Sequence, residues 1–380
     1  MDEISDYARL LLNGTPLLDV RAPVEFAKGS FPAAENHALL NDDERHQVGI
    51  RYKEAGQQAA IDLGHELVHG ATRDERIAAW RAFAEEHPEG ALFCFRGGLR
   101  SRIVQDWLRE AGVDYPRVAG GYKALRRFLL DAFEDAVPRT DFELLAGRTG
   151  TGKTRLIDER AHAIDLEGLA HHRGSAFGRR PGGQPVQIDF ENRLIIALLR
   201  QRAAHRHPVL LEDESHLIGR CHLPPTLQEK MKASPRIEVD EPIDSRIQVT
   251  LEDFVLNPLD EYQTWYGEAE AQQKLGEDLL AALERIRKRL GGARHQALRA
   301  ELENALREQR DRNNPDAHQA WIRALLTDYY DPMYDYMLSK RGGAVLFQGR
   351  RDEVRAWLRE RDAQRAGPHA NMTGATESHG

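Results

Sequence analysis

Short apolar runs alternate with segments of helical spacing along the first third of the chain. The runs at 17–20 (LLDV) and 90–95 (GALFCF) predict buried strands. Apolar positions at helical spacing predict helices at 73–87 and 101–112, and residues 115–130 repeat the order of strand, loop and helix. Because strands that alternate with helices form parallel sheets, this part of the chain is predicted to be an α/β domain.

The pattern restarts near residue 136, where the polar stretch DAVPRTD indicates a domain boundary. Residues 142–159 again predict a strand, a loop and a helix, and 208–219 begin as a strand that ends in acidic residues. The predicted fold class is therefore α/β, with two parallel-sheet domains in succession. The predicted domains are 1–135 and 136–255, followed by a helical insertion at 256–330, a return to the second domain at 331–365 and a disordered tail at 366–380.

A polar, helix-prone region interrupts the second domain. Residues 276–290 and 295–309 flank a pair of glycines and predict an antiparallel helix pair. Residues 342–350 predict one more buried strand, which returns to the second sheet. Upstream, residues 171–187 are rich in Gly, Pro and Arg, and this polar stretch is long enough to be a functional loop.

Composition narrows the class of protein. A chain of 380 residues exceeds one ordinary domain, which agrees with the two predicted from the pattern. Only two cysteines argue against a disulfide scaffold and favour a reducing, cytoplasmic location. The acidic start does not have the pattern of a signal peptide, and no apolar run is long enough to predict a membrane span. A net charge of −8 argues mildly against a nucleic-acid binder, but local patches decide that question.

The stretch FCFRGGLRS places a cysteine, Cys94, at the carboxyl end of a predicted parallel strand, where open α/β sheets bind their ligands. Gly97 and Gly98 allow the backbone to curl so that its N–H groups face the sulfur. The helix that starts near Ser101 and the charge of Arg100 both favour a thiolate over a thiol. We therefore interpret this stretch as a functional thiol loop rather than as a turn beside a buried cysteine.

Two chemistries use such a loop, and its own residues leave both open. One is the carriage of sulfur or selenium on Cys94. The other is phosphate-ester hydrolysis, because Cys94 and Arg100 also fit the pattern C-x5-R. Phe93 stands where cysteine phosphatases usually have a histidine, and the domain offers no convincing acid for the leaving group.

The segment LLDVRAPVEFAKGSFPAAEN resembles the opening of rhodanese-like domains, and the resemblance spans about residues 5–130. The thiol loop is one residue longer than the common rhodanese version. The residues at the familiar places are Asp19, Val20, Arg21, Glu25, Phe26, Gly29 and Asn36.

The stretch GRTGTGKT matches the phosphate-binding P-loop, G-x4-G-K-T, between an apolar strand and a helix. Its backbone N–H groups can surround a diphosphate, Lys153 supplies a point charge, and the Thr154 hydroxyl can bind Mg²⁺. Glu212 and Asp213, after the strand at 208, are candidates for acids on the Mg²⁺ side. The predicted phosphate-binding residues are Gly147, Arg148, Thr149, Gly150, Thr151, Gly152, Lys153 and Thr154.

The run HELVH, residues 65–69, matches the zinc-protease signature, but the glycines on either side leave little helix to hold a metal. No third ligand follows at the expected spacing, so we expect no zinc. Cys221 is interpreted as a packed loop residue.

Two clusters of cations are candidates for contacts with RNA phosphates, although a solvated face is the default interpretation of such runs. The candidate tRNA contacts are Arg173, Arg179 and Arg180 in the Gly-rich loop, and Arg285, Arg287, Lys288 and Arg289 in the run RIRKR.

To about residue 362, the whole chain resembles the tRNA 2-selenouridine synthase family, which joins a rhodanese-like domain to a P-loop NTPase-like domain with a helical insertion. The chain departs from the family pattern at Val186, where we expect a serine, so this position offers no hydroxyl group. The motifs that carry the resemblance are NDDERHQVGIRYKEAGQQAA, CFRGGLRS, AGGYKALRRF, GRTGTGKT, FENRL, EDESHLIG and YYDPMYDYML.

The resemblance implies a transferase that replaces sulfur by selenium in wobble 2-thiouridine of tRNA, with selenophosphate as donor. It also implies S-geranylation of that sulfur from geranyl diphosphate. The P-loop, with Lys153 and Thr154, would bind the diphosphate, together with Mg²⁺. Cys94 would carry or deliver selenium to C2, with Arg96 and Arg100 balancing the negative charge. The implied partners are the anticodon region of tRNA and an enzyme that supplies selenophosphate, with no membrane.

Three alternatives from other classes stay open on the sequence. One is a C-x5-R phosphatase with an accessory nucleotide domain. The second is a P-loop ATPase or kinase joined to a rhodanese-type sulfurtransferase. The third is a non-catalytic module that binds tRNA.

Overall fold

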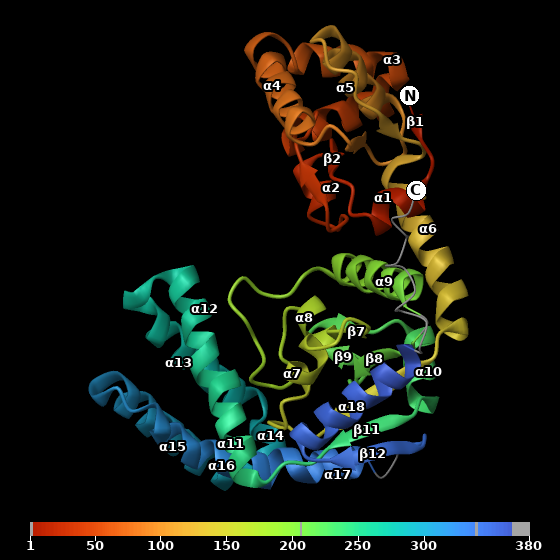
Figure 1. Cartoon of the computed structure of the whole chain (residues 1–380). Coiled ribbons are helices and arrows are strands. Elements are labelled where there is room, and N and C mark those ends of the chain that lie inside the picture. The colour runs from red at the N-terminus through yellow and green to blue at the C-terminus, as the bar shows by residue number, and fades with distance from the viewer. Residues whose placement is uncertain (1–2, 206, 339–340, 367–380) are drawn as a thin grey trace, which may run out of the picture. The chain divides into compact units, whose positions relative to one another are not determined.

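The computed structural model describes residues 3–205, 207–338 and 341–366, and these form two compact units. The first unit contains residues up to 136 together with 185–200, and the second contains 137–184 and the chain from 201 onward. Figure 1 labels many of their helices and strands. Within the described residues, no helix is long and apolar enough to cross a membrane.

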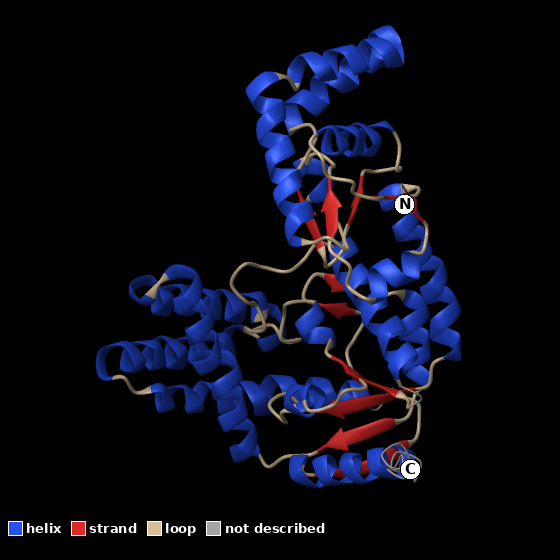
Figure 2. Cartoon of the chain, turned by 45° about the horizontal axis from the view of Figure 1, so that its top comes forward, coloured by secondary structure: helices blue, strands red, loops and turns tan. Residues whose placement is uncertain are grey.

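The first unit is built on a five-stranded parallel sheet in the order β1-β5-β4-β2-β3. The strands are β1 (Glu3–Ile4), β2 (Leu17–Asp19), β3 (Ala34–Asn36), β4 (Ala91–Phe93) and β5 (Arg117–Val118). The helices are α1 (Tyr7–Leu12), α2 (Pro23–Phe26), α3 (Asp42–Leu67), α4 (Gly70–Glu86), α5 (Leu99–Glu110) and α6 (Gly121–Ala136). Helices lie beside the strands of each sheet, blue beside red in Figure 2.

The apolar runs at 17–20 and 90–95 are confirmed as the buried strands β2 and β4. The helix predicted at 101–112 is confirmed, but it starts two residues earlier and ends at Glu110. The sequence pattern does not predict α3, because this helix is polar and lacks a clear apolar stripe. The Asn41 side chain and Glu44 form a capping box at its start, and Gly56 kinks it with a φ of 82°.

A buried ion pair fixes the end of β2. Asp19 and Arg21 are 0% and 2% exposed, and Arg21 Nη2 lies 2.6 Å from Asp19 Oδ2. The same nitrogen donates to the carbonyl of Gly29 at 2.9 Å, and the guanidinium lies 4.1 Å from the ring centroid of Tyr122. Burial raises the pKa of Asp19, while its contacts with Arg21 act in the opposite direction. These contacts give Asp19 and Arg21 of the segment LLDVRAPVEF a structural role.

The second unit contains another five-stranded parallel sheet, in the order β12-β11-β6-β8-β7. Its strands are β6 (Phe142–Gly147), β7 (Ala163–Ile164), β8 (Val209–Glu212), β11 (Arg236–Val239) and β12 (Val345–Gly349), and β9 (Leu217–Ile218) pairs with β10 (Cys221–His222) as a separate ribbon. The helices of this part are η1 (Val137–Arg139), α7 (Lys153–Asp158), α8 (Leu166–Leu169), α10 (Pro225–Ala233) and α18 (Arg351–Ala366). The strand predicted at 342–350 is confirmed as β12, but it is the partly exposed edge of the sheet and not a buried strand.

The helical region of the second unit has its own apolar core. Trp321, Leu302 and Tyr262 are almost fully buried in it, and Phe177 from the Gly-rich loop packs among them. Gly276, which precedes Gly291, lies next to Leu306, which follows it at the same separation in sequence. Two segments that meet in this way run in opposite directions, so the predicted antiparallel helix pair is confirmed. The helices are α11 (Ile243–Leu251), α12 (Asn257–Tyr266), α13 (Glu268–Arg285), α14 (Arg287–Leu290), α15 (Gly292–Arg312), η3 (Pro315–His318), α16 (Gln319–Leu325) and α17 (Asp331–Leu338), with π-helical turns at Glu252–Leu256 and Leu326–Tyr330.

One segment departs from the linear order of domains that the sequence suggested. Residues 185–200, which include most of α9 (Gln187–Ala204), group with the first unit although they follow the P-loop. Their polar residues explain why: Asp189 accepts a hydrogen bond from the Ser30 N–H at 2.7 Å. Asn192 donates to the Ser30 carbonyl at 2.6 Å and accepts from Arg126 at 2.6 Å. The disordered tail predicted at 366–380 lies outside the described residues beyond Ala366.

Candidate functional site

The first candidate site is the thiol loop. Cys94 follows β4 directly and is 3% exposed. Its Sγ lies 3.3 Å from the hydroxyl of Ser101, and that hydroxyl donates to the Gly98 carbonyl at 2.9 Å. The thiol is therefore held at the first turn of α5, whose N-terminal backbone dipoles favour negative charge.

Tight backbone packing fixes the path of this loop. Gly97 has a φ of +63°, and a Cβ there would lie 2.7 Å from the amide nitrogen of Gly120. The Tyr122 N–H donates to the Cys94 carbonyl at 2.9 Å, and the Lys123 N–H donates to the Phe95 carbonyl at 3.0 Å. The run AGGYK thus holds the thiol loop from the start of α6, a role that sequence reasoning did not assign to it.

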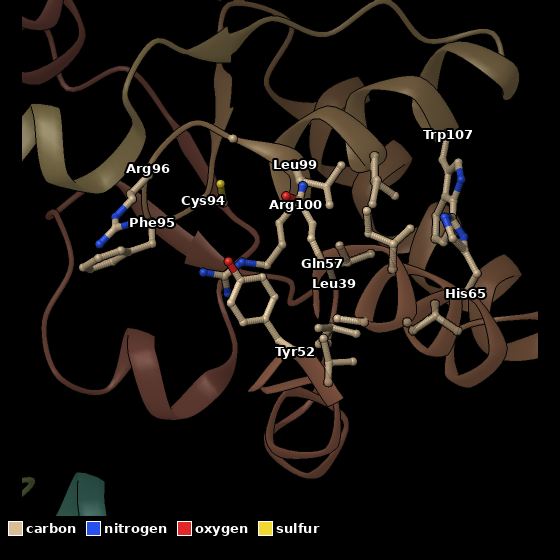
Figure 3. A pocket seen from close by; sticks show the side chains of 18 residues that line it. Leu39, Tyr52, Gln57, His65, Cys94, Phe95, Arg96, Leu99, Arg100 and Trp107 are labelled. Carbon is tan, nitrogen blue, oxygen red and sulfur yellow. The ribbon is translucent and has the colours of Figure 1, made fainter. Parts of the chain in front are cut away.

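The two arginines of the thiol loop differ. Arg100 makes two hydrogen bonds to Glu25, at 2.5 and 3.2 Å. Burial acts to lower the pKa of Arg100, but the hydrogen bonds and charge of Glu25, followed by Cys94 and Asp19, raise it overall. Arg96 is exposed, lies 6.0 Å from the ring centroid of Phe95, and is directed away from the sulfur in Figure 3. Arg100 is therefore the fixed cation of the loop, and Glu25 is its anchor.

An apolar pocket of about 530 Å³ opens beside the thiol. Its walls come from α3, α5 and the chain after β3, and the thiol loop forms one end. Figure 3 shows Cys94 at one end of the pocket and Trp107 with His65 at the other. The apolar wall residues include Leu39, Val48, Ile61, Leu99 and Ile103. This pocket could not be predicted from the sequence, because the pattern does not predict α3, which forms one of its walls.

The second candidate site is the P-loop between β6 and α7. Gly150 has a φ of +81°, and a Cβ there would lie 2.4 Å from the Thr250 hydroxyl. Lys153 Nζ donates to the Gly147 carbonyl at 2.7 Å, so the lysine folds back over its own loop. Thr151 donates to the Arg148 carbonyl at 2.9 Å. The loop therefore has the curled form that phosphate-binding turns require.

Residues of the YYDPMYDYML motif fasten the P-loop from α17. Arg246 donates to the Thr149 carbonyl at 2.9 Å and binds both carboxylate oxygens of Asp331 at 2.9 and 2.5 Å. Arg148 binds Asp335 at 2.7 Å, and this hydrogen bond raises the pKa of Arg148. Arg148 and Thr149 are thus tied to neighbouring protein groups, and Lys153 donates to a carbonyl of its own loop.

Two acids beside the predicted pair lie close to the P-loop. Of the predicted pair, Glu212 is fully buried and accepts from the Leu166 N–H at 2.8 Å, and Asp213 pairs with Arg341 and lines the same cleft as Lys153. Thr154 donates to Glu167 at 3.5 Å, and Glu167 shares a hydrogen bond with Glu214. Burial, followed by the charge of Glu214, raises the pKa of Glu167 well above its usual value. Burial also raises the pKa of Glu214, against the effect of Lys153.

The burial of Glu212 predicts a pH dependence of stability. Burial, followed by Asp165 and Glu167, raises the pKa of Glu212 well above its ordinary value of 4.5. Above pH 4.5 the folded protein thus keeps a proton that the unfolded chain has lost, so the free energy of unfolding falls as the pH rises. Glu212→Gln keeps an acceptor for Leu166 but cannot ionise. As the pH rises above 4.5, the free energy of unfolding of Glu212→Gln should increase relative to that of the wild type by up to about 1.4 kcal/mol per pH unit.

Urea unfolding of both proteins between pH 5 and pH 8 measures this difference, with Glu229→Gln, an exposed glutamate of the same unit, as the control. Parallel stability curves for Glu212→Gln and the wild type would contradict the raised pKa of Glu212.

The P-loop opens onto a cleft of about 1700 Å³ within the second unit. Arg173 and Arg180 line it and both bind Glu261, at 2.6 and 2.9 Å. Burial, followed by the charges of neighbouring arginines, lowers the pKa of His172 to about 4, so this residue is neutral at pH 7. The predicted tRNA contacts that line the cleft are Arg173, Arg179, Arg180, Arg285 and Arg289.

The two remaining predicted contacts, Arg287 and Lys288, lie on α14 and are not among the described residues that line the cleft. The run RIRKR is not one continuous helix, because α13 ends at Arg285 and α14 begins at Arg287. Arg287 pairs with Glu284 at 3.1 Å.

The HELVH run does not form the helical face that a zinc protease needs. Helix α3 ends at Leu67, and His69 precedes α4 with its Nδ1 2.6 Å from the Glu66 carbonyl. His65 packs against Trp107, with ring centroids 5.9 Å apart. Across 3–205, 207–338 and 341–366, no group of three or more His, Cys, Asp or Glu residues is arranged to hold a metal ion. Cys221 is buried, as expected for a packed residue.

The fold and the two loops define an α/β protein with parallel sheets, a thiol loop in one unit and a P-loop in the other. The family model described as the tRNA 2-selenouridine synthase AAA domain matches residues 140–365. A tRNA 2-selenouridine synthase from Alcanivorax borkumensis is 60% identical over 360 residues, which cover 95% of this chain and 99% of that protein. One from Marinobacter nauticus is 53% identical over 359 residues, covering 94% of this chain and 98% of that protein. The chain belongs to the tRNA 2-selenouridine synthase family, which confirms the resemblance inferred from its motifs.

Proposed function

We propose that this protein replaces the sulfur of 2-thiouridine at the wobble position of tRNA by selenium, in two steps that use its two loops in turn. The observation that carries the proposal is that one chain of this family presents a P-loop and a thiol loop, each lining its own cavity. The parallel sheet of the first unit, with Cys94 after its central strand β4, supports the rhodanese-like interpretation of that unit.

The first step is S-geranylation. The uridine sulfur attacks C1 of geranyl diphosphate, a C–S bond forms, the C–O bond breaks, diphosphate leaves with the electron pair, and the base loses its N3 proton to solvent. Lys153 and the P-loop backbone bind the diphosphate and stabilise its growing negative charge. This step matters because a thiocarbonyl sulfur is a poor leaving group and an alkylated sulfur is a better one.

The second step exchanges sulfur for selenium. The selenium of selenophosphate adds at C2, the C2–S bond breaks, and geranylthiolate leaves with its electron pair and takes up a proton. Water then cleaves the P–Se bond and releases phosphate, so no oxidant or reductant is needed. Cys94 holds the selenium of selenophosphate at C2 without forming a bond to it, and the charge of Arg100 and the loop amides balance the anion. Arg96, which is exposed, is placed to meet a phosphate group that approaches from solvent.

The oxygen groups beside the P-loop fit a magnesium ion. Thr154, Glu167 and Glu214 would hold it, since Mg²⁺ binds through one or two carboxylates, substrate phosphates and water. Bound there, the ion would neutralise charge on the diphosphate. We expect no zinc.

The substrate side of the proposal is tRNA. Arg173, Arg179, Arg180, Arg285 and Arg289 line the cleft of the P-loop and suit phosphate groups of the anticodon stem and loop. An enzyme that supplies selenophosphate is the expected partner, and we place the reaction in the cytoplasm.

Mass spectrometry of wobble nucleosides tests the proposal. Purified protein and 2-thiouridine tRNA are incubated with geranyl diphosphate, with selenophosphate, or with both. We expect S-geranyl-2-thiouridine with the first donor and 2-selenouridine with both. Unmodified 2-thiouridine in all three reactions would contradict the proposal and favour a module that only binds tRNA. Hydrolysis of aryl phosphates or ATP under these conditions would favour a phosphatase or an ATPase.

A further inference from the structure

The pocket beside Cys94 combines two kinds of surface. At one end lie the thiol, held by Ser101, and the charge of Arg100. The walls are mainly apolar side chains of α3 and α5 and continue to Trp107. Tyr52, Gln57 and His65 add polar groups to these walls, but most of the wall is apolar and offers an anion such as selenophosphate no hydrogen bonds. The pocket therefore suits a ligand with a polar, reacting end and an apolar chain.

Only one group in the proposed reaction has an apolar chain, and that is the geranyl group. We propose that the pocket beside Cys94 binds the geranyl chain of S-geranyl-2-thiouridine while selenium replaces sulfur at C2. This inference rests on the proposed function and adds a binding site for the leaving group. The volume of about 530 Å³ lies within the range of roughly 300–1,000 Å³ typical of small-molecule sites.

The position of the pocket beside Cys94 allows one site to hold the reacting C2–S bond and to select the geranylated substrate. With the chain among Val48, Ile61 and Ile103, the sulfur lies at the thiol end, where the C2–S bond breaks and C2–Se forms. Geranylthiolate leaves with the electron pair, gains a proton and stays in an apolar site. The pocket thereby selects uridines that have already been geranylated over plain 2-thiouridine, which lacks the chain.

The test compares two tRNA substrates in the full-length protein, one with S-geranyl-2-thiouridine and one with S-methyl-2-thiouridine, each with selenophosphate. Val48→Trp fills the pocket, and Leu99→Gln makes its wall polar. Leu130→Gln is the matched control, because Leu99 and Leu130 are both 41% exposed on helices of the same unit and only Leu99 lines the pocket. The readout is the ratio of kcat/KM for the S-geranyl substrate to that for the S-methyl substrate.

We expect this ratio to fall about tenfold or more in Val48→Trp and about threefold to tenfold in Leu99→Gln, from the lost apolar contact. In Leu130→Gln the ratio should stay at the wild-type value. Geranylthiol should also inhibit the wild type, and Val48→Trp should weaken that inhibition by about the same factor as the ratio.

Two results would overturn the inference without touching the proposed function. In one, the ratio is unchanged in both pocket variants, so the chain binds elsewhere. In the other, both substrates lose rate equally, so Val48 and Leu99 only support the thiol loop. Failure of the wild type to convert the S-geranyl substrate would overturn the proposed function and the inference together.

Discussion

Cys94→Ala should abolish the formation of 2-selenouridine while S-geranyl-2-thiouridine accumulates on the tRNA. The thiol lies at the end of the pocket and contacts Ser101 at 3.3 Å, so its loss removes the group that delivers selenium and leaves the P-loop untouched. We expect the rate of selenation to fall by about a hundredfold or more, the size of effect expected when a reacting group is misplaced by about 1 Å. Mass spectrometry of the wobble nucleoside, with both donors present, measures the two products separately.

The control for this prediction is Cys221→Ala. Cys221 is the other cysteine of the chain and is also buried, but it lies in the second unit beside β9. Its removal should leave both products at wild-type levels. If Cys94→Ala still makes 2-selenouridine at the wild-type rate, selenophosphate reaches C2 without the thiol, and the delivery role is wrong.

The parts of the site that the sequence could predict are those made by neighbouring residues. The apolar runs at β4 and β6 each end at a Gly-rich turn, so the chain order alone places Cys94 and Lys153 at strand ends. The type of each loop follows from its own residues, because a curled backbone needs glycine at fixed positions.

The parts that could not be predicted depend on residues far apart in the chain. Glu25 binds Arg100 across 75 positions, and Glu167 reaches Thr154 from α8, a helix whose sequence matches no motif. Glu212 and Asp213 have the right spacing after β8, but the register turns Glu212 toward α8 and Asp213 pairs with Arg341. Local spacing therefore identified the right strand end but not which acidic side chain lies near the threonine.

Lys153→Ala should prevent geranyl transfer and leave selenation of geranylated tRNA intact. The ammonium group contacts the Gly147 carbonyl at 2.7 Å and is the cation of the P-loop itself, since Arg148 is bound to Asp335. Loss of a charge-assisted hydrogen bond to the diphosphate should weaken its binding about tenfold to a hundredfold. Equilibrium binding of inorganic diphosphate and the rate of S-geranylation measure the two consequences.

A bypass experiment separates the lysine's role from the rest of the reaction. Lys153→Ala is given tRNA that already contains S-geranyl-2-thiouridine, together with selenophosphate, and should make 2-selenouridine at nearly the wild-type rate. Lys232→Ala, which removes an exposed lysine from α10 of the same unit, controls for the change in charge. If the bypass fails while the variant remains folded, the P-loop also serves the exchange step. Unchanged S-geranylation in Lys153→Ala would mean that the diphosphate binds at another site, because no other cation of this loop is free to replace the lysine within the described residues.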